Sequence, residues 1–146
     1  MSNAKEFHTN KRLAMVGASS KDSNKFGNMA AKELVQRGYE VFFVHPTADS
    51  IDGSTAYNSL AEVKDKVDGV IVCVPSHQAA KVVEEAAAAG LKNVWLQQGS
   101  DSPPVLAKAQ ELGLNLVSRK CILMYAEPVT GFHNFHKVLW KLIGQY

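Results

Sequence analysis

The chain has 146 residues, of which 46% are hydrophobic and 21% are charged, and this is the size and composition of one globular domain. Its 16 basic residues are nearly matched by 14 acidic ones, so the net charge of +2 argues against a nucleic-acid-binding surface. No apolar run approaches the ~20 residues of a membrane span, and two cysteines are too few for a disulfide framework, so we expect a cytoplasmic protein.

Residues 1–10 are expected to form an N-terminal extension, in which residues 1–4 resemble a cloning remnant, and residues 11–146 to form the domain. Five short apolar runs follow one another along this domain. Each is apolar on successive residues, which is typical of strands buried on both faces of a parallel sheet. The predicted strands are Leu13–Val16, Val41–Val44, Val70–Val74, Val94–Leu96 and Leu114–Val117.

Amphipathic segments of helical length separate these strands. Three of the predicted helices end at a glycine directly before the next strand: Gly38, Gly90 and Gly113. Ser76 and Ser102 are expected to be N-caps, and Ser59 with Glu62 matches a capping box that opens a short helix. A last amphipathic helix is predicted over residues 132–142. The alternation predicts an α/β domain with a doubly wound, parallel, five-stranded sheet.

A ligand of such a sheet binds at the carboxyl ends of the strands, where the strand order reverses. Gly17 follows the first strand and allows a sharp turn. The amides of Ser19 and Ser20 would then lie near the N-terminus of the next helix, an arrangement that binds phosphate. Lys21 and Lys25 would add positive charge, although a plain turn with solvated lysines is the alternative.

Two features disfavour NAD as the ligand. The segment from Gly17 to Gly27 does not match the G-x-G-x-x-G pattern of dinucleotide-binding domains. NAD-binding domains also end their second strand with an acidic residue for the ribose, whereas this chain has His45-Pro46 there and its nearest acid, Asp49, lies further along. A different nucleotide is therefore favoured.

Four strand-end segments occur in order: Gly17-Ala18-Ser19, Val41–Pro46, Val72–Pro75 and Val94–Gly99. Together they resemble the small, stand-alone CoA-binding domain proteins of bacteria, which are similar to the N-terminal CoA-binding domain of the succinyl-CoA ligase alpha subunit. The resemblance covers residues 11–125. It implies a Rossmann-like domain that binds coenzyme A or an acyl-CoA without a covalent bond.

The resemblance also implies roles by position. The loop after the first strand would hold the pyrophosphate, the loops after the second and third strands would lie near the adenosine, and the loop after the fourth would border the pantetheine. The ligase's lysine after its second strand corresponds to Ala48 here, so Lys21 and Lys25 are the candidates for the 3′-phosphate. The expected cofactor-binding residues are Gly17, Ala18, Ser19, Ser20, Lys21, Lys25, His45, Pro46, Val74, Pro75, Gln97, Gln98 and Gly99.

No catalytic residue or metal ligand is assigned. Cys73 in the third strand is expected to be an inert, packed residue. Cys121 follows the fifth strand beside two basic residues that would favour its thiolate, so a mixed disulfide with CoA is an alternative to simple packing. His133 and His136 share a helix face, where metal ligation is the alternative to surface histidines.

Our primary hypothesis is therefore a non-catalytic CoA-binding protein. The alternatives are a minimal NAD(P)-dependent oxidoreductase or an acyl-CoA-using enzyme, for which Cys121 and Glu127 are the candidate catalytic groups. The apolar face of the last helix could also join a second copy or a ligase-like partner, although packing on its own sheet explains the same pattern.

Overall fold

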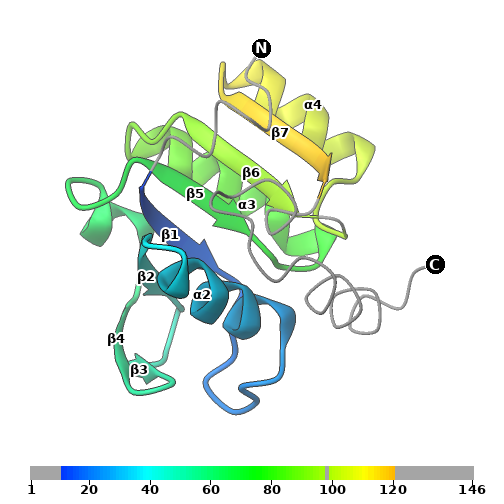
Figure 1. Ribbon diagram of the computed structural model, residues 1–146. Coiled ribbons are helices and arrows are strands. Elements are labelled where there is room, and N and C mark those ends of the chain that lie inside the picture. The colour runs from blue at the N-terminus through cyan, green and yellow to red at the C-terminus, as the bar shows by residue number, and fades with distance from the viewer. Residues whose placement is uncertain (1–10, 98, 121–146) are drawn as a thin grey trace.

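The computed structural model describes residues 11–97 and 99–120 (Figure 1). Seven strands form one sheet in the order β3-β4-β2-β1-β5-β6-β7. All neighbouring strands are parallel except β3 and β4, which are antiparallel. The strands are β1 (Arg12–Val16), β2 (Glu40–Val44), β3 (Ser50–Ile51), β4 (Ser54–Tyr57), β5 (Gly69–Val72), β6 (Asn93–Gln97) and β7 (Asn115–Lys120).

The five predicted strands are all present, as β1, β2, β5, β6 and β7. The third is shorter than predicted, since Cys73 and Val74 lie just beyond its end, and the fifth begins at Asn115 and continues to Lys120, beyond its predicted end at Val117. The expected five-stranded sheet is extended to seven by the hairpin of β3 and β4, which adds to the edge of β2. Asp52 (φ 49°) and Gly53 (φ 81°) form its two-residue turn, where Asp-Gly is a preferred pair because both residues need positive φ.

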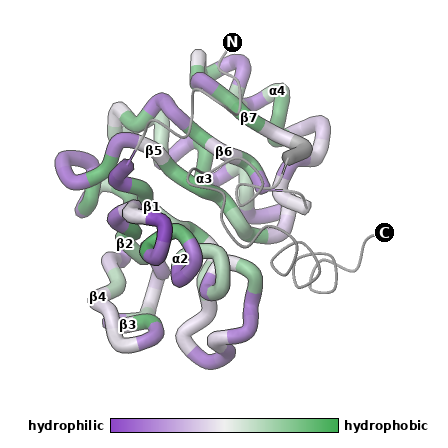
Figure 2. Tube along the Cα trace, in the orientation of Figure 1, coloured by the Kyte–Doolittle hydropathy of each residue, from purple (hydrophilic) through white to green (hydrophobic). Residues whose placement is uncertain are grey.

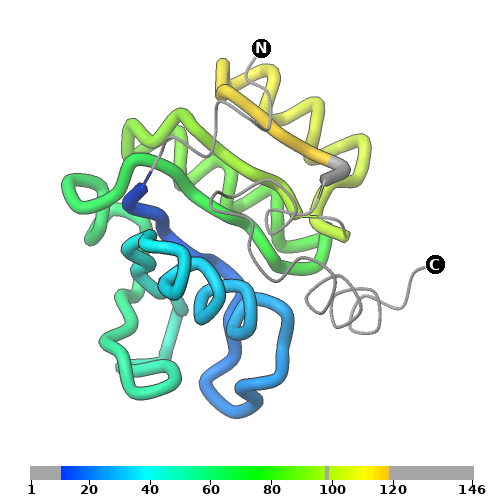
Figure 3. Tube along the Cα trace, viewed as in Figure 1, coloured from blue at the N-terminus to red at the C-terminus, as the bar shows by residue number. Residues whose placement is uncertain are grey.

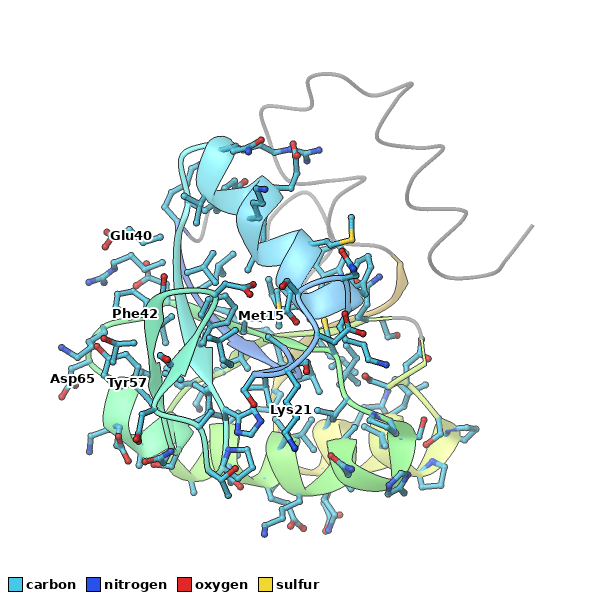
Figure 4. All side chains as sticks on the ribbon, turned by 90° about the horizontal axis from the view of Figure 1, so that it is seen from below. Met15, Lys21, Glu40, Phe42, Tyr57 and Asp65 are labelled. Carbon is cyan, nitrogen blue, oxygen red and sulfur yellow. The ribbon has the colours of Figure 1, made fainter. Side chains whose placement is uncertain are left out.

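The helices cover both faces of the sheet, which is therefore doubly wound. α2 (Phe26–Gln36) packs on one face, and η1 (Leu60–Val63), α3 (Ser76–Ala88) and α4 (Pro103–Glu111) pack on the other. Figure 4 shows α2 on one side of the sheet with Met15 beneath it, and α3 and α4 on the opposite side. The strand directions and right-handed crossovers of a parallel sheet require such helices on its faces.

Alternate residues of each strand contribute to two separate cores. The core under α2 contains Leu13, Met15, Ile71 and Trp95. The core under α3 and α4 contains Ala14, Val70, Val72 and Val94. Figure 2 shows β5 and β6 as hydrophobic along most of their length. This is the pattern that the successive apolar residues predict for strands buried on both faces.

The three glycines predicted to end helices all have positive φ, as expected. Ser102 lies at the N-cap of α4 with Pro103 as the first helical residue, as predicted, although its side chain makes no capping hydrogen bond. Ser76 is not the N-cap of α3, because Pro75 holds that place and the Ser76 hydroxyl donates to the carbonyl of Gly99. None of the described helices is long and apolar enough to cross a membrane.

Ser59 lies at the N-cap of η1, as predicted, but the predicted capping box does not form, because the Ser59 side chain makes no capping hydrogen bond. Glu62 Oε1 accepts from the amide of Asn58 at 3.4 Å, one residue before the cap. In this short 3₁₀ helix the Glu62 carboxylate therefore lies over Asn58 and not over Ser59.

Candidate functional site

The strand order reverses between β1 and β5, because α2 leads from β1 to β2 on one side while β5 lies on the other. In an open α/β sheet this is where a ligand binds. Three of the loops that contain the sequence-predicted residues leave the carboxyl ends of β1, β2 and β5. The fourth leaves β6, the next strand along. The fold therefore places the predicted residues along one edge of the sheet.

The loop after β1 begins with a very close approach between two backbones. Gly17 has φ +120°, and a Cβ at this position would lie 2.5 Å from the carbonyl oxygen of Cys73. The amide of Cys73 donates to the carbonyl of Val16 at 2.7 Å. This bond holds the start of the loop after β5 against the end of β1. Only glycine fits this position without a shift of the backbone.

The N-terminus of α2 also packs closely on this loop. A Cβ on Gly27 would lie 3.1 Å from the nitrogen of Ala18, so the absence of a side chain there brings the first helical turn onto the loop backbone. Close packing of a helix start on the first strand's loop is the arrangement that dinucleotide-binding domains also use. The sequence alone indicates no packing role for Gly27, and the structure shows one.

Hydrogen bonds within the loop define its shape. Ser19 Oγ accepts from the amides of Lys21 and Asp22, both at 3.0 Å, and the amide of Ser19 donates to Asn28 Oδ1 at 2.7 Å. The sequence-based expectation that the Ser19 amide faces an anion therefore needs adjustment, since this N–H already has an acceptor. A phosphate at this loop would rely on the start of α2 and on side chains.

The start of α2 is suited to an anion. Among the described residues, no side chain caps this helix, whose N-cap is Lys25, and its first turn contains no acidic residue. The first N–H groups of a helix lack partners within the helix and carry its positive dipole end. Lys21 and Lys25 are both exposed. In Figure 4, Lys21 lies between the α2 layer and the α3 layer.

The loop after β2 is held together by hydrogen bonds to the side chain of His45. Its Nδ1 accepts from the amides of Thr47 at 3.1 Å and Ala48 at 3.0 Å, so the neutral ring carries its proton on Nε2. Asn58 donates to the carbonyls of His45 and Ala48 and braces the loop from the other side. Pro46 is exposed at the tip. The loop expected near the adenosine is therefore held in one shape.

The loops after β5 and β6 are tied to each other. Ser76 Oγ donates to the carbonyl of Gly99 at 2.9 Å, and Ser100 Oγ donates to the carbonyl of Val74. Gln97 at the end of β6 is buried, while Pro75 and Gly99 are exposed. Gln98 lies outside the described residues. The structure thus brings Val74, Pro75 and Gly99 into one paired segment at the edge.

Reactive groups at this edge are few within the described part of the chain. Cys73 is half-buried, and its Sγ lies 3.7 Å from Met15 Sδ. Within the ranges 11–97 and 99–120, no three His, Cys, Asp or Glu side chains are grouped to hold a metal ion. Cys121, Glu127, His133 and His136, with the predicted last helix, lie outside those ranges.

The electrostatic pair that stands out lies away from this edge, at the start of β1. Arg12 donates two hydrogen bonds to the carboxylate of Asp68, at 2.8 and 3.2 Å. These bonds lower the pKa of Asp68 below its ordinary value and raise that of Arg12. Because Arg12 begins β1 and Asp68 directly precedes β5, the pair joins the amino ends of two central strands.

Sequence reasoning missed three side chains that shape the site: Asn28, Asp52 and Asn58. Asp52 could have been found, because Asp-Gly between short polar and β-branched residues is a hairpin signal. Asn28 and Asn58 gave no local signal, since their partners are far away in the sequence.

Comparison with known proteins finds a matching family model and similar proteins of about the same length. A family model described as "CoA binding domain" matches residues 11–127. The uncharacterized protein YneT of Bacillus subtilis is 32% identical over 112 residues, which are 77% of this chain and 82% of YneT. The structure of a hypothetical protein from Pyrococcus horikoshii OT3 is similar, with a TM-score of 0.77, 32% identity, and coverage of 88% of this chain and 90% of that one.

The chain is also similar to part of a larger enzyme. The ADP-forming acetate–CoA ligase I of Archaeoglobus fulgidus is 27% identical over 138 residues, which are 88% of this chain but only 20% of the ligase. The similarity therefore concerns about a fifth of that enzyme's length.

Proposed function

The chain belongs to the CoA-binding domain family, and on that premise we propose that it binds coenzyme A or an acyl-CoA at the carboxyl edge of its sheet, without catalysing a reaction on it. The start of α2 would bind the phosphates. The observation that carries this proposal is the close packing of α2 on the loop after β1, which aims an uncapped helix start at the strand-order reversal.

The rest of the ligand follows the edge. The pyrophosphate would lie against the first turn of α2 and the exposed ammonium groups of Lys21 and Lys25. The adenosine would lie near the braced loop of His45 and Pro46, and near the turn at Val74 and Pro75. The pantetheine arm would extend past the loop that follows β6, where Gly99 is exposed.

The residues that would hold the cofactor are suited to binding. The loops after β2, β5 and β6 are each braced by hydrogen bonds to a neighbouring loop or strand. A preformed site loses little conformational entropy on binding, which favours affinity. We assign the candidate site a binding role and assign no catalytic group among the described residues.

Titration calorimetry with parallel ligands tests the proposal. We expect CoA to bind and NAD and NADP to bind at least tenfold more weakly, and dephospho-CoA would report whether the 3′-phosphate is recognised. Acetyl-CoA compared with CoA would show whether an acyl group changes the affinity. Absence of heat and of any rise in melting temperature with CoA and acetyl-CoA would refute the proposal, since a ligand of the native state must stabilise it.

A further inference from the structure

Asn28 is a buried polar residue with an unusual set of partners. It is the third residue of α2 and is only 2% exposed. Its Oδ1 accepts from the amide of Ser19 at 2.7 Å, and its Nδ2 donates to the carbonyl of Ser19 at 2.9 Å and to Asp52 Oδ2 at 3.0 Å. A buried carboxamide must be hydrogen-bonded to be tolerated, and this one uses both its donors.

Two of these bonds control the loop after β1. They hold Ser19 on both its N–H and its C=O, so the backbone cannot rotate there without losing a bond. The Ser19 hydroxyl in turn accepts from the amides of Lys21 and Asp22. The position of the Lys21 backbone therefore depends on Asn28 through Ser19.

The third bond reaches a separate part of the fold. Asp52 lies in the turn of the β3–β4 hairpin, 24 residues from Asn28. Figure 3 shows that the loop after β1 and this hairpin project side by side from the same end of the molecule. The hairpin is joined to the loop after β2, because the amide of Ala56 donates to the backbone carbonyl of Asp49 and that of His45 donates to the backbone carbonyl of Tyr57.

We propose that Asn28 is a positioning residue that joins the loop after β1 to the β3–β4 hairpin, and so sets the distance between the phosphate side and the adenosine side of the nucleotide site. The inference rests on the proposed function, because it concerns the same ligand. Asn28 itself needs no contact with that ligand. Its effect passes through Ser19 on one side and Asp52 on the other.

Charge and positioning predict opposite effects at Asp52, which makes a sharp test. Removing an acidic side chain near an anionic ligand should strengthen binding if charge alone matters. If the hydrogen bond to Asn28 matters, Asp52→Gly, which also accepts the positive φ of 49° in this turn, should weaken CoA binding by about tenfold, equivalent to about 1.4 kcal/mol. Asp52→Asn keeps an acceptor oxygen for Asn28 Nδ2, so its affinity should equal or exceed that of the unmodified protein. Asp49→Ala serves as the charge-matched control.

Exchanging the partners gives a second test. Asn28→Asp keeps the acceptor for the Ser19 amide but loses the donor to the Ser19 carbonyl and places a carboxylate against Asp52, so CoA affinity should fall by about tenfold or more. The double variant Asn28→Asp with Asp52→Asn restores a hydrogen bond between the two side chains but not the bond to the Ser19 carbonyl, so its affinity should lie between that of Asn28→Asp and that of the unmodified protein. Asn93→Asp, a half-buried asparagine at the start of β6, is the matched control and should leave affinity unchanged.

Calorimetry with CoA on each variant, with urea unfolding of the same samples, decides between the outcomes. If the unmodified protein fails to bind CoA, the proposed function itself is refuted. If it binds and Asp52→Gly binds as tightly or more tightly, the positioning role of Asn28 is wrong while the proposed function stands. Loss of affinity in Asn28→Asp without recovery in the double variant would also refute the link to Asp52. Asp52 is exposed, so its variants remain testable even if Asn28→Asp fails to fold.

Discussion

Replacing Gly17 by alanine tests the close approach on which the candidate site depends. The new Cβ would lie 2.5 Å from the carbonyl oxygen and 2.6 Å from the carbonyl carbon of Cys73, both backbone atoms that cannot rotate away. The residue also has φ +120°, a conformation that residues with a side chain rarely adopt. Alanine would therefore be strained twice, once by its own backbone and once by its neighbour.

The two costs can be separated with Gly38. It ends α2 with φ +96°, but a Cβ there would meet no atom within 4 Å. Gly38→Ala should lower the free energy of unfolding only through backbone strain, by about 1–3 kcal/mol. Gly17→Ala should lower the free energy of unfolding by a similar amount through backbone strain, and by about 1–3 kcal/mol more through overpacking against Cys73. The difference between the two variants in free energy of unfolding is then the cost of the close approach.

Urea unfolding at 25 °C, followed by circular dichroism, measures both variants against the unmodified protein. We expect Gly17→Ala to be the less stable of the two by about 1–3 kcal/mol. Its affinity for CoA should also fall, because the loop backbone must move away from Cys73. An equal or smaller loss of stability in Gly17→Ala than in Gly38→Ala would refute the reasoning that the contact with Cys73 makes glycine necessary.

Lys21→Ala combined with Lys25→Ala should weaken CoA binding by about tenfold and reduce its dependence on salt concentration, since exposed ion pairs are screened. Calorimetry at two salt concentrations measures both effects. Lys92→Ala, directly before the amino end of β6, is the control. Asp68→Asn should lower stability at pH 7, because Arg12 holds the pKa of Asp68 below its ordinary value of 3.8 and the ionised carboxylate stabilises the fold. This stabilisation is present above that ordinary value and is lost as the pH falls through the lowered pKa, so the two proteins should converge in urea unfolding at acid pH. A difference that persists unchanged at pH 2 would contradict this account. The effect should be small, since the two side chains are 46% and 40% exposed.

The sequence by itself determined the strands and helices that carry a strong local pattern. β1, β5 and β6 arise from successive apolar residues that are buried on both faces of the sheet, and β2 and β7 arise from apolar runs that are only partly buried. The helix ends at glycine depend on the backbone freedom of that single residue. The same local order of strand-end segments led to the family, and the comparisons confirm it.

Only the tertiary structure decided how polar side chains pair across the molecule. Ser76 is predicted to be an N-cap, yet it is the first residue of α3 and its hydroxyl donates to the carbonyl of Gly99, which is 23 residues away. Asn28 looks like an ordinary helical residue until Ser19 and Asp52 are brought beside it. Hydrophobic periodicity is repeated along an element and can be read locally. A hydrogen bond between distant residues depends instead on the strand order and on where each crossover returns the chain, so it becomes visible only once the sheet is assembled.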